Sequence, residues 1–213
     1  MFRSRRIFAV CALWALLAAD AGAQSWLEEY LVHRNPSFTE EGSGSCYVCH
    51  AGENMRAMNE SVHGNPDNPL SPAALHECES CHGPGSIHIS RAHGGRGFPP
   101  LIVFGYGDEA APRSTQISAC LYCHDGDDGT KPVTWEGTVH DRMIVKGTGC
   151  HRAHVRQDPV MERASQAEVC LHCHKTTRDG HPQVGKRVPD FSRMGCAGCH
   201  RVHRLPKTST GGG

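Results

Sequence analysis

The chain has few aromatic residues, a modest apolar content and no excess of either charge. Aromatic residues make up 6% and apolar residues 38% of its 213 residues, both low for a domain of this length, so its side chains alone would form a thin core. The 22 basic and 22 acidic residues exclude the basic excess expected of a nucleic-acid-binding protein. Strand-like alternation is absent outside Leu101–Phe104. The composition therefore predicts a fold stabilised by something besides its own apolar residues.

Long apolar runs are also missing after the N-terminus. The run Ile7–Ala19 follows three arginines and precedes Ala21-Gly22-Ala23, which is the pattern of a secretory signal peptide cleaved after Ala23. A membrane anchor is the alternative, but the run is shorter than the ~20 residues that span a bilayer. We therefore expect a periplasmic protein with no transmembrane segment after cleavage. Without its signal peptide the chain is slightly acidic, which favours partners with basic docking patches.

Cysteine and histidine, in contrast, are abundant and follow one pattern. Five C-x-x-C-H motifs begin at Cys46, Cys78, Cys120, Cys170 and Cys196. This motif is the attachment signature of c-type haem: two thiols bond to the porphyrin and the adjacent histidine ligates the iron. A disulfide framework or a zinc ribbon does not require histidine after every cysteine pair. The motifs therefore predict at least five molecules of haem c.

A sixth motif lacks only its first cysteine. Gly147-Thr148-Gly149-Cys150-His151 divides the longest interval between motifs, and Gly149–His154 repeats Gly198–His203 with one difference. We expect Cys150 and His151 to hold a sixth haem through a single thioether bond. The alternative is that this haem is lost and Cys150 is a free thiol.

The motifs assign haem-binding roles to most of the cysteines and histidines. The predicted covalent attachments are Cys46, Cys49, Cys78, Cys81, Cys120, Cys123, Cys150, Cys170, Cys173, Cys196 and Cys199. The predicted proximal iron ligands are His50, His82, His124, His151, His174 and His200. The predicted distal ligands, on the opposite side of each iron, are His63, His88, His140, His154, His181 and His203. Histidine on both sides leaves no open position on the iron and suits electron transfer.

Several local patterns select the distal candidates. His63 and His140 share a Val-His ending, and His154 and His203 each follow a proximal histidine by three residues, so each can ligate a neighbouring haem. His88 lies in a turn after the second motif, and His181 precedes a proline. The four remaining histidines fit no pattern, although one of them is the main rival to His88; they are His33, His76, His172 and the rival His93.

The expected fold is that of a multihaem cytochrome c, mostly irregular, with short α-helices packed around a chain of haems and almost no β-sheet. Helices are expected within Thr115–Cys123 and Met161–Cys173, the second beginning near Asp158-Pro159. Loops are expected over Gly83–Gly107 and Asp125–Thr134. The predicted divisions are a signal peptide (1–23), an N-terminal segment (24–45), a multihaem domain (46–205) and a flexible tail (206–213).

The sequence resembles the periplasmic multihaem cytochromes of the MtrA/DmsE type, and also the pentahaem electron donors of periplasmic nitrite reduction. The similar stretches are Cys78–Gly85, Cys120–His124, Trp135–His140 and Cys199–His203. The resemblance implies a rod of bis-histidine haems that carries electrons across the periplasm. It also implies redox partners, namely a membrane quinol dehydrogenase and a terminal reductase or outer-membrane porin–cytochrome complex. This chain has fewer repeats than the decahaem members, and Gly147 stands where they have cysteine.

These features predict an electron carrier without a substrate site, acting in anaerobic respiration or extracellular electron transfer. The alternative is a multihaem oxidoreductase of the nitrite or hydroxylamine type, with one open-site haem near Cys150 and His151. A third hypothesis is a structural subunit that docks other cytochromes.

Overall fold

The computed structural model describes residues 35–92, 101–124, 133–187, 189–191 and 193–203. Within these residues it contains short helices and no strand, apart from one isolated bridge between Val184 and Arg187, so the predicted fold class is confirmed. The helical elements are α2 (Ser43–Tyr47), α3 (Glu53–Asn59), η1 (Val62–Gly64), η2 (Pro72–Ala74), α4 (Glu79–His82), α5 (Ser86–Ala92), α6 (Arg113–His124), α7 (Val139–Arg142), η3 (Gly147–Gly149), α8 (Gln166–Leu171), α9 (Thr177–Gly180) and η4 (Cys196–Gly198).

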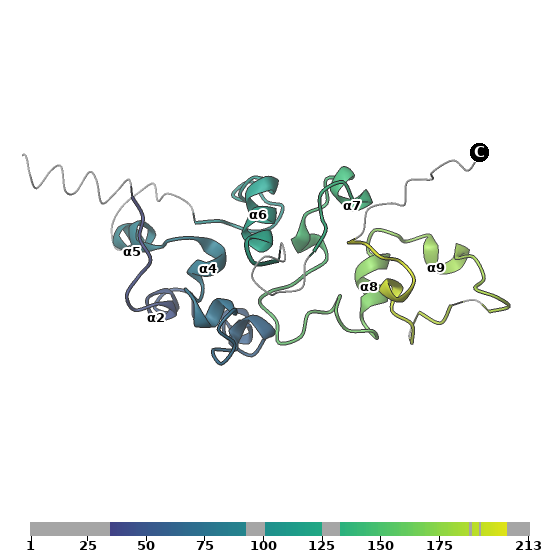
Figure 1. The fold of residues 1–213 in the computed structure, drawn as a ribbon, viewed down its shortest axis with the longest axis horizontal. Coiled ribbons are helices and arrows are strands. Elements are labelled where there is room, and N and C mark those ends of the chain that lie inside the picture. Colours follow the sequence, from purple (N-terminus) through teal and green to yellow (C-terminus); the bar gives the residue numbers. More distant parts are fainter. Residues whose placement is uncertain (1–34, 93–100, 125–132, 188, 192, 204–213) are drawn as a thin grey trace, which may run out of the picture.

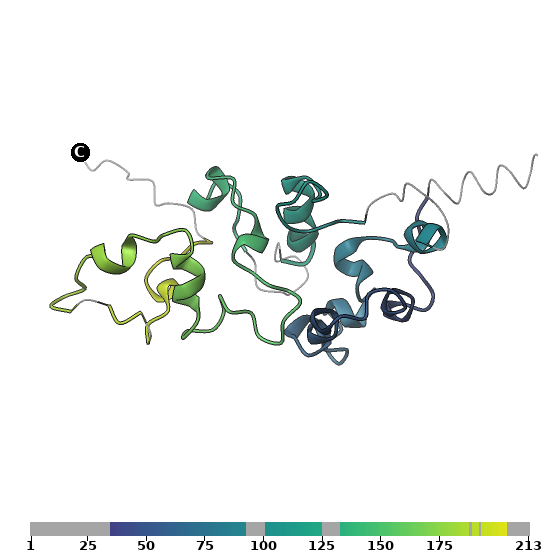
Figure 2. The same ribbon diagram turned by 180° about the vertical axis from the view of Figure 1, so that it is seen from behind.

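The elements follow one another along an elongated molecule (Figure 1). Helices α2, α4 and α5 lie toward one end, α6 and α7 near the middle, and α8 and α9 toward the other end; Figure 2 shows the same order from behind. None of the helices in the described part of the chain has the length and hydropathy needed to cross a bilayer. The predicted signal peptide, the expected tail and most of the expected Asp125–Thr134 loop lie outside the described residues.

Helix α6, the longest among the described residues, confirms the helix expected within Thr115–Cys123. The second expected helix is shorter than predicted, because α8 begins only at Gln166. The preceding residues form turns instead: Met161 N donates to the carbonyl of Asp158 at 2.9 Å, and Ser165 Oγ donates to the carbonyl of Pro159 at 2.9 Å. The predicted start near Asp158-Pro159 was therefore wrong.

The segment Gly83–Gly107 was expected to be a loop, but it contains helix α5. Ile89 N donates to the carbonyl of Gly85 at 2.9 Å, and the Glu79 carboxylate accepts from Gly85 N at 2.6 Å. The Glu79 side chain, in the second motif, thus accepts from the backbone N–H of Gly85, just before the helix begins. The alternating segment Leu101–Phe104 forms no strand, and Ile102 N donates to the carbonyl of His82 at 2.9 Å.

The buried residues are mostly polar. Among the described residues, Ile87 and Ala167 are the buried apolar side chains. The buried polar side chains are Ser71, Glu79, Gln116, Thr138 and Gln166. Large apolar residues at the candidate sites are exposed instead: Val48 and Tyr122, inside motifs, at 74% and 81%, and Val62, next to His63, at 80%. The side chains alone therefore bury little apolar surface, and the fold needs an apolar group to pack against.

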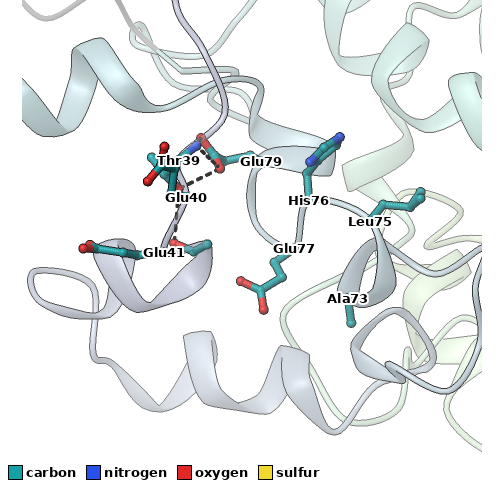
Figure 3. A pocket seen from close by; sticks show the side chains of 9 residues that line it. Thr39, Glu40, Glu41, Ala73, Leu75, His76, Glu77 and Glu79 are labelled. Atoms are coloured by element: carbon teal, nitrogen blue, oxygen red, sulfur yellow. Dashed lines mark hydrogen bonds between the residues drawn. The ribbon is translucent and has the colours of Figure 1, made fainter.

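Glu79, inside the second motif, binds the N-terminal segment to that motif. Its carboxylate accepts from Thr39 N at 3.0 Å and from Thr39 Oγ1 at 2.9 Å (Figure 3). The hollow beside it is also lined by the carboxylates of Glu40, Glu41 and Glu77. A buried carboxylate with several donors is well satisfied, so Glu79 positions residues 37–42 next to the first two motifs.

Candidate haem-binding sites

The C-x-x-C-H motifs share a tight backbone turn. In four of the complete motifs the histidine N–H donates to the carbonyl of the first cysteine; the bonds are His50–Cys46 at 2.9 Å, His82–Cys78 at 3.0 Å, His174–Cys170 at 3.1 Å and His200–Cys196 at 2.8 Å. In the third motif the corresponding residues are the last turn of α6. This turn places two thiols and an imidazole at a fixed spacing, as attachment to one porphyrin requires.

The incomplete motif forms the same turn. His151 N donates to the carbonyl of Gly147 at 2.8 Å, and Cys150 N donates to the same carbonyl at 3.0 Å. Gly147 therefore occupies the backbone position of the missing first cysteine. The motif has lost a thiol but kept the geometry around it.

Every proximal candidate faces one distal candidate across a nearly constant gap. The ring centroids are separated by 6.4 Å for His50–His88, 6.1 Å for His82–His154, 6.2 Å for His124–His63, 6.0 Å for His151–His203, 6.2 Å for His174–His140 and 6.0 Å for His200–His181. We number these pairs sites 1 to 6 in the order of their motifs.

This gap has a chemical meaning. Metal–imidazole bonds are about 2.0–2.1 Å long, so two imidazoles on opposite sides of one metal ion have centroids roughly 6 Å apart. Direct ring stacking is much closer, as in the pair of Phe38 and His76 at 3.7 Å. The six separations thus fit an iron atom between each pair of rings. The residues present fit haem c.

Contacts between neighbouring sites arrange them in one row. The thiols of Cys46 and Cys78 interact, so sites 1 and 2 are neighbours: burial, and then the Cys78 thiol, raise the pKa of Cys46 to about 11. Burial and the Cys120 thiol likewise raise the pKa of Cys81 to about 11, joining sites 2 and 3. Burial and the Cys196 thiol raise the pKa of Cys170 to about 11, joining sites 5 and 6.

The middle of the row is joined by the same kinds of contact. His63 of site 3 interacts electrostatically with His151 of site 4. Burial, and then the Cys173 thiol of site 5, raise the pKa of Cys150 in site 4. Each site thus interacts with the next, and the six pairs form a continuous series.

Burial also keeps several rings in the neutral form that a metal requires. It is the main cause of the lowered pKa of His63, His82, His154 and His203. A lowered pKa preserves the unprotonated nitrogen to more acidic pH, and ligation needs that nitrogen. Of the four histidines that fit no pattern, His76 and His172 are exposed, and His33 and His93 lie outside the described residues.

Two supporting residues were missed at the sequence level. Gln116 and Gln166 lie four residues before the first cysteine of the third and fifth motifs, in the repeated pattern Q-x-x-x-C-L-x-C-H. The Gln116 amide donates to the carbonyl of Ala111 at 2.7 Å and accepts from Gly105 N at 3.0 Å. The Gln166 amide accepts from Ala197 N at 2.7 Å, which ties the fifth motif to the sixth. The repeated glutamine was the signal that could have revealed this role.

The geometry defines a c-type cytochrome with several haem sites, and comparison with known proteins agrees. Residues 78–173 match the family described as "Cytochrome c-type protein NrfB-like". The chain is 33% identical over 168 residues to "Multiheme cytochrome MtrA" of Shewanella baltica (strain OS185), an alignment that covers 78% of this chain and 48% of that protein. The chain therefore belongs to the multihaem c-type cytochromes. It spans about half the length of this relative.

Proposed function

We propose that the protein relays electrons through six bis-histidine haems, in anaerobic respiration or extracellular electron transfer. The observation that carries this proposal is the series of six histidine pairs with centroid separations of 6.0–6.4 Å. Haem supplies a reversible one-electron iron couple when it is bound. The role of the chain is to attach each haem through the motif thiols, to ligate its iron on both sides and to keep neighbouring sites close.

The proposal extends to the location and the partners. The basic and apolar pattern of residues 1–23 supports export to the periplasm. Residues 35–92 hold a clear excess of carboxylates over basic side chains, which favours a partner with a basic docking surface at that end. We propose a membrane quinol dehydrogenase and a terminal reductase or outer-membrane porin–cytochrome complex as the two partners.

The enzyme alternative requires an iron with an open position near Cys150 and His151. In the described residues the His203 ring lies opposite His151, with 6.0 Å between the ring centroids. That separation supports a second protein ligand at site 4, as at the other five sites. The arrangement therefore favours an electron carrier over an oxidoreductase.

Carbon monoxide binding tests the proposal, because carbon monoxide binds ferrous haem only where a coordination position is open. We expect no spectral change when the reduced holoprotein is exposed to the gas. A carbon monoxide complex in the unmodified protein would contradict bis-histidine ligation and favour the enzyme alternative.

A pair of variants calibrates this experiment. His181→Ala removes the ring that faces His200 at 6.0 Å and should open one iron, so that about one haem in six binds carbon monoxide. The matched control His172→Ala removes an exposed histidine of the fifth motif and should leave the spectrum unchanged. If His181→Ala does not bind the gas, the proposed ligand pairing at site 6 is wrong.

A further inference from the structure

His151, in the motif with one cysteine, has a carboxylate as the partner of its second ring nitrogen. Its Nδ1 donates to Asp158 Oδ2 at 2.7 Å. A ring held in this way presents its other nitrogen, Nε2, to a metal. At site 2, His82 Nδ1 donates instead to the neutral carbonyl of Ile102 at 2.8 Å. The two proximal candidates are both oriented through Nδ1, but only the partner of His151 carries a charge.

The Asp158 side chain is itself held in place. Its second oxygen, Oδ1, accepts from Arg152 N at 3.2 Å and from Val160 N at 3.3 Å. The carboxylate therefore closes the loop that follows the incomplete motif and fixes the direction of its bond to the ring.

We propose that Asp158 is a positioning residue of site 4, which orients His151 and lowers the reduction potential of the iron that His151 ligates. This inference rests on the proposed function, since it requires a haem at site 4. A carboxylate bonded to a ligating imidazole increases the electron donation of that ring, and its negative charge stabilises ferric over ferrous iron. It also anchors the ring at the site where one of two thioether bonds is missing.

The test compares holoproteins carrying Asp158→Asn, Asp158→Glu and Glu60→Gln. Asparagine keeps an acceptor oxygen for Nδ1 but removes the charge, while glutamate keeps the charge. Glu60 is the matched control because it pairs with Arg156 at 2.6 Å near the same loop without a bond to a candidate ligand. Intact mass counts the haems, and a spectroelectrochemical titration measures site 4 at the displaced α band of its singly attached haem.

For Asp158→Asn we expect roughly a tenfold shift toward the ferrous state at a given applied potential, equivalent to 59 mV for one electron. Asp158→Glu keeps the charge and should hold the potential close to that of the unmodified protein, and Glu60→Gln should show no shift. Loss of the sixth haem from Asp158→Asn alone would also support the positioning role. Six haems with an unchanged potential in Asp158→Asn, or an equal shift in Glu60→Gln, would overturn the inference alone. Five haems in the unmodified protein would overturn the proposed haem count and this inference together.

Discussion

Replacing Gly147 with cysteine should convert the incomplete motif into a complete one. A Cβ atom built at Gly147 meets no other atom within 4 Å, whereas one at Gly149 would lie 2.7 Å from Tyr106 Oη. The turn is already formed, because Cys150 N and His151 N both donate to the carbonyl of Gly147. The new thiol would therefore stand where Cys196 stands in the sixth motif, and we expect it to form a second thioether bond to the haem at site 4.

The stoichiometry follows from the cysteine count. Of the 12 cysteines, Cys11 lies in the predicted signal peptide and the others all belong to motifs. Six haems would consume every remaining thiol in the unmodified protein, including Cys150 through its single bond. Titration of the denatured holoprotein with a thiol reagent should accordingly find no free thiol, both before and after Gly147→Cys. The pyridine haemochrome should change in about one sixth of its α band, as the last unreacted vinyl group disappears.

Gly147→Ala is the matched control, because it adds the Cβ atom without the thiol. Both variants lose the same flexibility of glycine in the unfolded chain, which is worth about 0.4–1 kcal/mol, so their comparison isolates the thioether bond. Alanine should leave the haem count and the α band as in the unmodified protein. An intact mass with five haems, together with one free thiol in the unmodified protein, would refute the single-thioether site. An α band unchanged by Gly147→Cys would refute the proposed alignment of the thiol.

Three further predictions concern what stabilises the fold. Gln116→Ala and Gln166→Ala should each lower the free energy of unfolding of the holoprotein by about 1–3 kcal/mol, because buried backbone groups lose their partners; urea titration should show no such loss for the exposed Gln157→Ala. Glu79→Gln should make the N-terminal segment more sensitive to protease, because an amide donates where backbone N–H groups need an acceptor. The control is Glu53→Gln, at an exposed position, and equal cleavage rates in the two variants would contradict this role for Glu79. The haem-free chain should lack a cooperative thermal transition by circular dichroism, and a sigmoidal melting curve would show that the protein folds without haem.

The positions of the motifs could be read from the sequence because each motif is local. A C-x-x-C-H motif is read within five residues, and the repeated flank of Cys150-His151 located the fourth site although a thiol is missing. The limits of the second expected helix were not predictable, because side chains bond to the backbone of the turns before it: Asp158 accepts from Arg152 N and Val160 N, and Ser165 donates to the carbonyl of Pro159. Such side-chain bonds compete with helix formation in a way that propensity does not describe.

The pairing of proximal and distal rings could not be predicted either, because it joins segments far apart in the chain. His63 follows the first motif but faces His124 of the third. His154 follows the fourth motif but faces His82 of the second. Local patterns identified both histidines as distal candidates, yet only the three-dimensional arrangement relates each to its site.

The pairing nevertheless follows a rule that explains how so little apolar core can hold six sites together. The segments after the first and third motifs supply rings two sites forward, through His63 and His140. The segments after the fourth and sixth motifs supply rings two sites back, through His154 and His203. Two sites back from the second motif, or two sites forward from the fifth, there is no site in the row. The segments after these two motifs instead supply His88 to site 1 and His181 to site 6, one site away. Each of sites 2 to 5 therefore receives a histidine from a segment that follows a motif two sites away. The proposed iron–histidine bonds would connect these distant segments, as side-chain packing does in other folds.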